Sequence, residues 1–456
     1  MLQAVKGITT EANFLFKAAL GIGFLIFSVK KAIDNQTSPV MEFGKLLLLG
    51  GVTWNLFLSS SNDDKHRFMV YDEVTSKSYV ISQLPVGMGV SFALMSNFER
   101  VVLKSMEKHF STPQSTNFSN AGLGFSLDVI SSLPNVKLAT IDPISQQNMN
   151  LFFRNCVAIG MDLHPNADIA YRQSDNLAHT LFEDIGRGSQ LAVYTKKNGD
   201  NLTQDLISYT DAGKNIKNDI ENDLDKAEAL HAAYLGYAKD LETYRKNFLG
   251  AAQIYNQQAI SARSYLQQSM LLFASREATI NTAKSVGLDP NAVAANSAIA
   301  DQQFFASMQA QGRLAQTYLP LAKAYLTAII IGLSWLVAIL SVIFGSYAHI
   351  KMFFTLCLWM ALWTPILSII NYLNNYNLMK VSSAIVGNEQ ALTISSNIAI
   401  FRKVAENSNF INYLVMSTPV LAYAIAKASE QGFVTFASSL SQALTGASRA
   451  AGSFAN

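Results

Sequence analysis

The sequence has few charged residues. Aspartate, glutamate, lysine and arginine make up 14% of its 456 residues, and half of the chain is apolar, whereas ordinary soluble domains carry about 25% charged residues. Charges are sparse near residues 14–58, 320–373 and 410–428, and they are ordinary between 62 and 315. This uneven distribution indicates a membrane protein that carries a water-soluble insert.

An excess of positive charge is also missing. The formal net charge is only +2, and nucleic-acid binders usually show a strong basic excess. We therefore expect no direct, sequence-specific contact with nucleic acid.

Cysteine is scarce as well. The two cysteines are Cys156 and Cys357, and Cys357 lies inside an apolar run, so we do not expect them to form a disulfide with each other. If Cys156 faces an oxidising compartment, it can pair only with another chain. The favoured interpretation is two inert thiols.

Sequence motifs for catalysis are absent too. The chain has no G-x-x-x-x-G-K-[ST] phosphate loop, no H-E-x-x-H, no paired C-x-x-C and no G-x-S-x-G. The six histidines are scattered without metal-ligand spacing. Asp162, His164 and Asp168 could together hold a cation, but solvated loop side chains are the favoured interpretation. We expect no catalytic residue, no metal and no cofactor, and we expect that the protein is not an enzyme.

Two apolar runs are long enough to cross a bilayer, which takes about 20 residues. Ala324–Phe344 and Met352–Tyr372 contain no charged residue and are separated by a short polar turn. A buried soluble helix could imitate one such run, but hardly two in succession. The sequence therefore predicts a membrane helical hairpin, in which lipid-embedded neighbours can tolerate Pro365.

Three weaker apolar segments complete a prediction of about five membrane or membrane-embedded helices. Phe14–Val29 and Leu46–Leu58 predict a short N-terminal hairpin, although a signal peptide is the alternative for the first. The small residues Gly21, Gly23, Gly50 and Gly51 predict close helix contacts there, in a cyclic homo-oligomer. Phe410–Lys427, with Pro419 as a kink, is the fifth candidate.

Basic residues in short loops predict the orientation. Lys30, Lys31, Lys45 and Lys351 fall on one side if the first four segments all span. That side is expected to be the cytoplasm, which places residues 61–318 in the periplasm of a multi-pass inner-membrane protein.

The first part of the insert predicts mixed structure. Phe68–Asp72 and Ser78–Ile81 predict a β-hairpin. Apolar residues then recur at helical spacing, with charged residues off their face. The apolar positions are Phe92, Met95, Val102 and Met106, and the charged ones are Glu99, Arg100, Lys104 and Glu107. This pattern predicts an amphipathic periplasmic helix, followed by short helices and loops over 111–150 and another short helix over Asn150–Asp162.

The second part of the insert predicts long helices over 203–318. Apolar residues repeat every three to four positions, as in a coiled-coil or helical-hairpin seam. These residues are Leu224, Ala227, Leu230, Tyr234, Tyr237 and Leu241. Two interpretations remain open: an ordinary soluble subdomain, or a stalk that packs against copies of itself or a partner. Gly287–Pro290 is expected to break the helices.

Ionisable side chains are nearly absent from the predicted membrane segments, whereas ion-coupled transporters normally need them. Lys17 and Lys323 lie near helix ends, where their amines can reach the interface. Trp359 and Trp363 lie one turn apart and about 10 Å or more from the Met352 end, at 1.5 Å per residue, which favours a helix–helix contact over an interfacial aromatic belt.

The order of five short motifs resembles the N-terminal region of the TraG family, the mating-pair stabilisation and pilus-assembly proteins of F-type conjugative type IV secretion systems. An unrelated coupling ATPase shares that name, but it needs the phosphate loop that this sequence lacks. The resemblance covers nearly the whole chain. Its motifs are Gln83–Met88 with Pro85, Val86 and Gly87, Leu151–Val157 with Cys156, Leu319-Pro320, Leu362–Leu367 with the following Asn371, and Met416–Ala424.

The resemblance implies a structural inner-membrane subunit that supports pilus assembly and the inner-membrane end of the translocation channel. Its implied partners are the lipid bilayer, further copies of the chain, pilin and other secretion-system subunits. A large C-terminal region associated with mating-pair stabilisation and entry exclusion is not part of this sequence, so pilus assembly is the role expected here. The alternative is a stand-alone membrane channel or transporter.

Six regions summarise these expectations. They are an N-terminal membrane hairpin (1–60), a periplasmic mixed region (61–202), long periplasmic helices (203–318), a membrane helical hairpin (319–373), a periplasmic connection (374–409) and a final membrane helix with a short tail (410–456).

Overall fold

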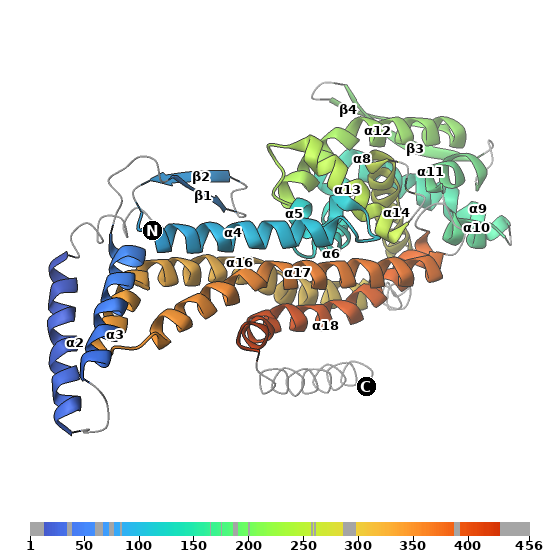
Figure 1. Ribbon diagram of the computed structural model, residues 1–456. Helices are drawn as coiled ribbons and strands as arrows, with labels where there is room; N and C mark the ends of the chain where they lie inside the picture. Colours follow the sequence, from blue (N-terminus) through green and yellow to red (C-terminus); the bar gives the residue numbers. More distant parts are fainter. Residues whose placement is uncertain are drawn as a thin grey trace. The chain divides into compact units, whose positions relative to one another are not determined.

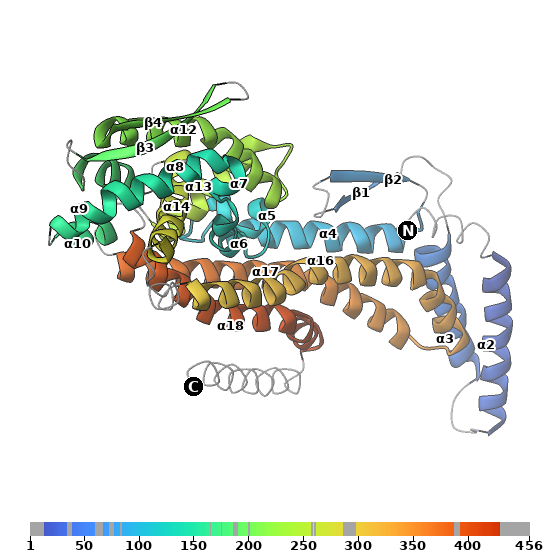
Figure 2. The same ribbon diagram turned by 180° about the vertical axis from the view of Figure 1, so that it is seen from behind.

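The computed structural model is mainly helical (Figures 1 and 2). It describes residues 13–33, 39–59, 67–72, 77–82, 84–164, 166–174, 176–185, 190–198, 201–256, 259, 261–285, 298–386 and 393–428. The expected helix break at Gly287–Pro290 and the tail after the fifth segment lie outside these residues. The chain forms two compact units. One is Met1–His109 with Leu314–Ile369 and Tyr413–Asn456, and the other is Phe110–Arg313 with Ile370–Asn412.

The first unit contains the apolar helices. Its elements are α2 (Asn13–Ile33), α3 (Pro39–Thr53), the π-helix η1 (Trp54–Leu58), strands β1 (Arg67–Asp72) and β2 (Lys77–Ser82), α4 (Val86–Glu107), and parts of α16 (Ala298–Ile343), α17 (Ala348–Val386) and α18 (Ile394–Lys427). The predicted hairpin is confirmed, because β1 pairs with β2 in antiparallel register.

Three helices in the described part of the chain are long and apolar enough to cross a membrane. They are Val86–Glu107, Leu321–Ile343 and Ala348–Ile385. Two of them coincide with the two helices of the predicted membrane hairpin. The third is α4, which the sequence predicted as a periplasmic amphipathic helix. The segments Phe16–Val29, Phe43–Phe57 and Leu414–Lys427 are apolar helices too, but shorter.

Side-chain contacts fix the direction of α4 relative to its neighbours. Met88 contacts Ser334, and Glu99 contacts Lys323, so α4 runs antiparallel to α16. The ring of Phe92 lies 6.0 Å from that of Phe353. A buried apolar cluster joins these helices to α2 and η1; it contains Phe16, Phe57, Met88, Phe92, Ala338, Val342, Phe353 and Cys357.

The second unit holds short helices and a second hairpin. Its elements are η2 (Gln114–Thr116), α5 (Phe118–Ala121), α6 (Phe125–Ser132), η3 (Leu133–Asn135), α7 (Leu138–Ile141), α8 (Pro143–Phe152), η4 (Phe153–Val157), α9 (Ala158–Leu163), α10 (Ala167–Gln173), α11 (Leu177–His179), η5 (Thr180–Asp184), β3 (Leu191–Asn198), β4 (Asn201–Ser208), α12 (Tyr209–Tyr234), α13 (Leu241–Tyr255) and α14 (Ala262–Ser285). The short helices expected over 111–150 are confirmed, and Asn150–Asp162 is divided among α8, η4 and α9.

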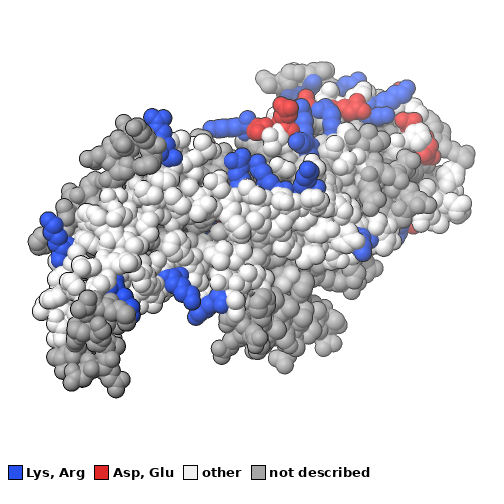
Figure 3. Space-filling model, viewed as in Figure 1, with Lys and Arg blue, Asp and Glu red and all other residues white. Residues whose placement is uncertain are grey.

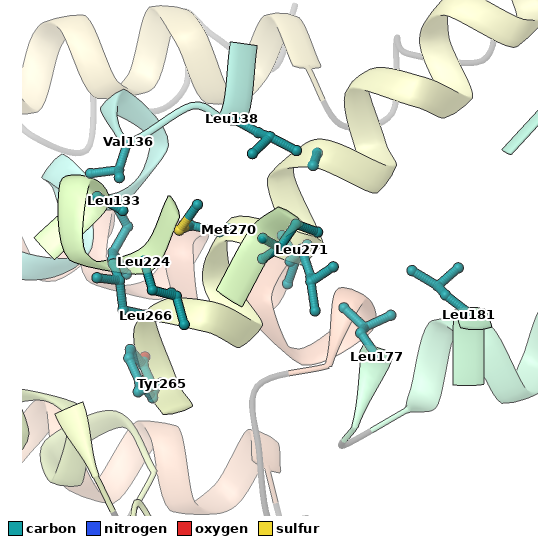
Figure 4. Close-up of a cluster of buried hydrophobic side chains, with 14 of the residues drawn as sticks. Leu133, Val136, Leu138, Leu177, Leu181, Leu224, Tyr265, Leu266, Met270 and Leu271 are labelled. Carbon is teal, nitrogen blue, oxygen red and sulfur yellow. The ribbon is translucent and has the colours of Figure 1, made fainter. Parts of the chain in front are cut away.

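A single apolar core holds this unit together. Leu177 and Leu181 from α11 and η5 meet Leu271 from α14, while Leu133 and Leu224 line the other end (Figure 4). Burial of such side chains is worth about 1.5–3 kcal/mol each relative to exposure, so the core stabilises helices that are individually too short to be stable.

The helical expectation for residues 203–208 is wrong. These residues form β4, which pairs with β3 along its whole length. The side chain of Asn148 on α8 explains why β3 stays in place, because it accepts a hydrogen bond from the Thr195 amide (2.8 Å) and donates one to the Thr195 carbonyl (2.9 Å). The helix begins only at Tyr209, where Ser208 caps it by accepting from the Asp211 amide.

For the apolar repeat over Leu224–Leu241, the coiled-coil alternative is wrong, and the helical-hairpin alternative agrees with two helices joined by a turn. Helix α12 ends at Tyr234, and Gly236 adopts a left-handed φ of 86° before α13 begins. Leu224 and Ala227 are buried in the core, whereas Leu230 is 41% exposed. The repeat therefore crosses a turn, which no continuous seam can do.

Candidate functional site: a buried polar cluster among apolar helices

Glu99, Lys323 and Thr364 meet between α4, α16 and α17. The Lys323 amine donates to the Glu99 carboxylate and contacts the Thr364 hydroxyl, which also donates to Glu99. The side chains of Glu99 and Lys323 are only 7% and 17% exposed. The expectation that Lys323 extends to the interface is therefore wrong, since its amine is held inside the unit by a carboxylate.

The buried face of α4 differs from the one that the sequence predicted. Glu99 and Glu107 point inward, while Leu94 and Val101 are 64% and 65% exposed. Inward Met88 and Phe92 continue the same buried face toward the start of the helix. The physical reason is that α4 meets hydroxyl and amine groups on its neighbours, so its carboxylates find partners inside.

Small polar side chains form a stripe along α17. Thr364, Ser368, Asn371 and Asn375 follow one another at intervals of four, three and four residues, and all are buried. This spacing places them on one side of the helix. In the first unit, the Ser368 hydroxyl donates to Glu107 over 2.9 Å.

Asn371 and Asn375, the last two residues of this stripe, belong to the second unit and form hydrogen bonds there. The Asn371 side-chain amide donates to the Thr116 carbonyl over 3.0 Å and accepts from the Gly124 amide over 3.0 Å. Asn375 donates to the same carbonyl over 3.2 Å. Asn371, predicted as a family-motif residue, thus satisfies backbone groups of the loop around α5.

Trp359 and Trp363, which the sequence predicted to form a helix–helix contact, lie against each other, and Trp359 reaches α18. Their ring centroids are 5.4 Å apart. Trp363 is 1% exposed, and the Trp359 indole donates to the Pro419 carbonyl on α18 over 2.7 Å. Pro365 and Pro419 both lie inside continuous helices.

The N-terminal glycines divide into two kinds. A Cβ at Gly23 would lie 2.7 Å from the Val342 carbonyl oxygen, and one at Gly50 would lie 3.1 Å from the Leu20 side chain. Gly21 and Gly51 have nothing within 4 Å of such a Cβ. Within one chain, Gly23 and Gly50 therefore make close helix contacts, and Gly21 and Gly51 face outward.

The motif around Pro85 forms the junction between η1 and α4. Pro85 is the N-cap of α4, and Val86 begins the helix. A Cβ at Gly87 would lie 2.5 Å from the Leu56 carbonyl oxygen. Only glycine allows η1 to approach α4 this closely.

Cys156 is buried in the core of the second unit, and both cysteines are free thiols. Burial raises the pKa of the Cys156 thiol to about 11. A thiol that is neither ionised nor accessible is unreactive, which agrees with the interpretation of an inert cysteine.

His231 forms a buried hydrogen-bonded chain that the sequence did not reveal. One ring nitrogen lies 2.8 Å from the Ser132 hydroxyl and the other 2.7 Å from the Tyr244 hydroxyl. Burial lowers the pKa of His231 to about 4, so the ring is neutral near pH 7. No group of three or more His, Cys, Asp or Glu that could hold a metal ion occurs in the described ranges.

The buried cluster around Glu99 is the strongest candidate for a functional site. Ionisable groups inside apolar helix bundles are costly and usually mark a structural lock or an ion path. In Figure 3 the acidic side chains that can be seen gather over the second unit, and the visible surface over α4 is white or blue. Sequence reasoning missed Glu99, Lys323 and Thr364 as a group. The available signal was the apolar spacing of Val90, Leu94 and Phe98 on the other side of α4.

Comparison with known proteins identifies one family. The model described as "TraG-like protein, N-terminal region" matches residues 1–451. Searches of curated proteins and of solved structures find no match.

Proposed function

Because the chain belongs to the TraG-like N-terminal family, whose members are conjugative transfer proteins, we propose that it is a structural inner-membrane subunit of a conjugative type IV secretion system. It supports pilus assembly and the inner-membrane end of the translocation channel. The family match over residues 1–451 carries this proposal. In this proposal, partner ATPases hydrolyse ATP for the system. The segment Phe110–Arg313 lies in the periplasm, where it contacts pilin and other subunits.

The apolar helices support the membrane part of the proposal. Three described helices are long enough to cross a bilayer, and the most hydrophobic, Leu321–Ile343, is followed directly by Ala348–Ile385. A helical pair of this kind has its backbone hydrogen bonds satisfied internally, as the hydrocarbon requires.

The alternative function is a stand-alone membrane channel or transporter. The observation that favours it is the Glu99–Lys323 pair, since proton and ion pathways use such intramembrane groups. Purified protein in liposomes would conduct ions without partners under this alternative, and would not under the proposed function.

The test of the proposed function is complementation in conjugating cells that lack the native copy. Wild type is expected to restore piliation and transfer. Trp363→Ala, which empties a buried site on α17, is expected to reduce pilus formation while the protein still enters the membrane. Tyr347→Ala, at a 50% exposed position, is the matched control and is expected to behave as wild type. Normal piliation with Trp363→Ala would show that this packing face is not needed for assembly, and unrestored piliation with wild type would refute the function.

A further inference from the structure

Helix α4 carries an apolar stripe on its outward side. Val86, Val90, Leu94, Phe98 and Val101 are between 36% and 65% exposed. Their spacing of three to four residues places them along one side of the helix, opposite the buried carboxylates. A helix in water shows the reverse arrangement, with carboxylates outside and apolar side chains inside.

The end of this stripe carries positive charge. Lys104 and Lys108 follow Val101 on the same side of α4 and are both exposed. Lysine side chains at the end of a membrane helix reach the headgroup layer, where they meet phosphate oxygens. Along α4 an apolar stripe is followed by lysines, and this order matches a bilayer, in which the hydrocarbon core is followed by the headgroup layer.

The stripe continues the apolar surface of the neighbouring helices. Leu333 on α16 is 49% exposed, and Leu358 on α17 is 41% exposed. Because Met88 lies beside Ser334 and Glu99 beside Lys323, α4 occupies the same layer as the apolar part of α16.

We propose that α4 crosses the lipid bilayer with this stripe against the hydrocarbon, so that the β1–β2 hairpin and the segment after Glu107 emerge on opposite faces of the membrane. The inference rests on the membrane location in the proposed function. It changes the expectation from the sequence, in which residues 61–318 all lie on one side.

The antiparallel arrangement supports this topology. The end of α4 near Glu107 and the start of the apolar part of α16 near Lys323 lie at one end of the first unit, because the two helices are antiparallel. The start of α4 points the other way, toward the face of the α16–α17 turn. The β1–β2 hairpin, which precedes α4 directly, belongs to that second face.

The experiment compares the accessibility of two introduced cysteines. In a background with Cys156→Ala and Cys357→Ala, Ser78→Cys marks β2 and Asn201→Cys marks β4; both positions are exposed. Cells with a permeable outer envelope are treated with a membrane-impermeant maleimide before and after the inner membrane is opened. Lys239→Cys, another exposed position in the same insert, is the control and must label like Asn201→Cys.

One of the two sites is expected to be fully protected until the membrane is opened, and the other is not. Labelling of both from the same side would overturn the topology. If Leu94→Cys forms disulfide-linked dimers efficiently, the stripe contacts a second copy of the chain, and the proposed contact with lipid is overturned. Release of the protein by carbonate would instead refute the membrane location itself, so failure of the proposed function is distinguishable from failure of this inference.

Discussion

Glu99 and Lys323 are charged residues in an environment that their type seldom occupies. Each is largely withdrawn from water, and each has the other as its charge partner. Removing one member of a buried pair leaves an uncompensated charge, which is far more costly than losing both.

Lys323→Ala is therefore expected to destabilise the protein by about 3–5 kcal/mol, the range for breaking a buried pair. The exchanged variant, Glu99→Lys with Lys323→Glu, is expected to recover part of this loss. The measurement is the thermal unfolding midpoint of the detergent-purified protein. Lys17→Ala, at an exposed position, is the control, and equal midpoints for all four proteins would contradict a stabilising pair.

His231 predicts a pH dependence of the second unit. Its pKa is lowered from 6.5 to about 4 in the folded chain, so between these values the unfolded chain binds the proton more strongly. Stability is expected to be full above about pH 6.5 and to fall as the pH decreases toward 4, by about 3 kcal/mol in total. Denaturant unfolding of wild type and His231→Gln over this range would check it, because the pH slope of the variant should be smaller. Parallel curves would assign the slope to other groups.

At the scale of elements, α4 is positioned by close contacts that need glycine. Gly87→Ala is expected to separate η1 from α4, since the new Cβ meets a backbone oxygen at 2.5 Å that cannot rotate away. The measurement is the yield of folded, membrane-inserted protein. Gly44→Ala on α3 is the matched control: its Cβ meets nothing within 4 Å, and alanine in a helix gains about 0.5–1 kcal/mol over glycine. A Gly87→Ala protein as stable as Gly44→Ala would contradict the described junction.

The sequence predicted elements well where one helix or one local turn decides the structure. The pair of long apolar helices, the first β-hairpin and the short helices over 111–150 follow from apolar run length, alternation and local turn residues. The second hairpin was missed because its strands alternate weakly, although Gly199-Asp200, the pair between the two strands in the sequence, is a common hairpin turn pair. The inward face of α4 was missed because its polar partners, Lys323 and Thr364, are distant in the sequence; only the apolar spacing on the other side of the helix pointed to it.

At the scale of the whole molecule, the homo-oligomer expected from the sequence would use the N-terminal helices. A groove of about 360 Å³ lies between α2 and α3 and is lined by Phe16, Leu20, Leu47 and Gly51, among others. Gly51 has open space above it, and Gly21 does too. Closely packed membrane helices use such small residues at their contacts.

We therefore expect a chain that carries both Gly21→Cys and Gly51→Cys, in a background with Cys156→Ala and Cys357→Ala, to form disulfide crosslinks between copies in native membranes. The products on a non-reducing gel should form a ladder that ends at a fixed number of copies, because closed rotational symmetry limits the assembly. Val29→Cys, exposed on α2 but remote from a glycine, is the control for random collision. A crosslinking pattern that never exceeds the monomer would contradict the homo-oligomer.

The Glu99–Lys323 pair also sets an order of events during synthesis. The two residues are 224 positions apart, and ribosomes add about 5–20 residues per second. Glu99 thus leaves the ribosome about 10–45 seconds before the only lysine that contacts it in the described structure. During that interval the Glu99 carboxylate lacks the amine with which it pairs in the folded chain. Helix α4 can complete its packing only when α16 has been made, so the first unit stays unfinished until most of the chain has been translated.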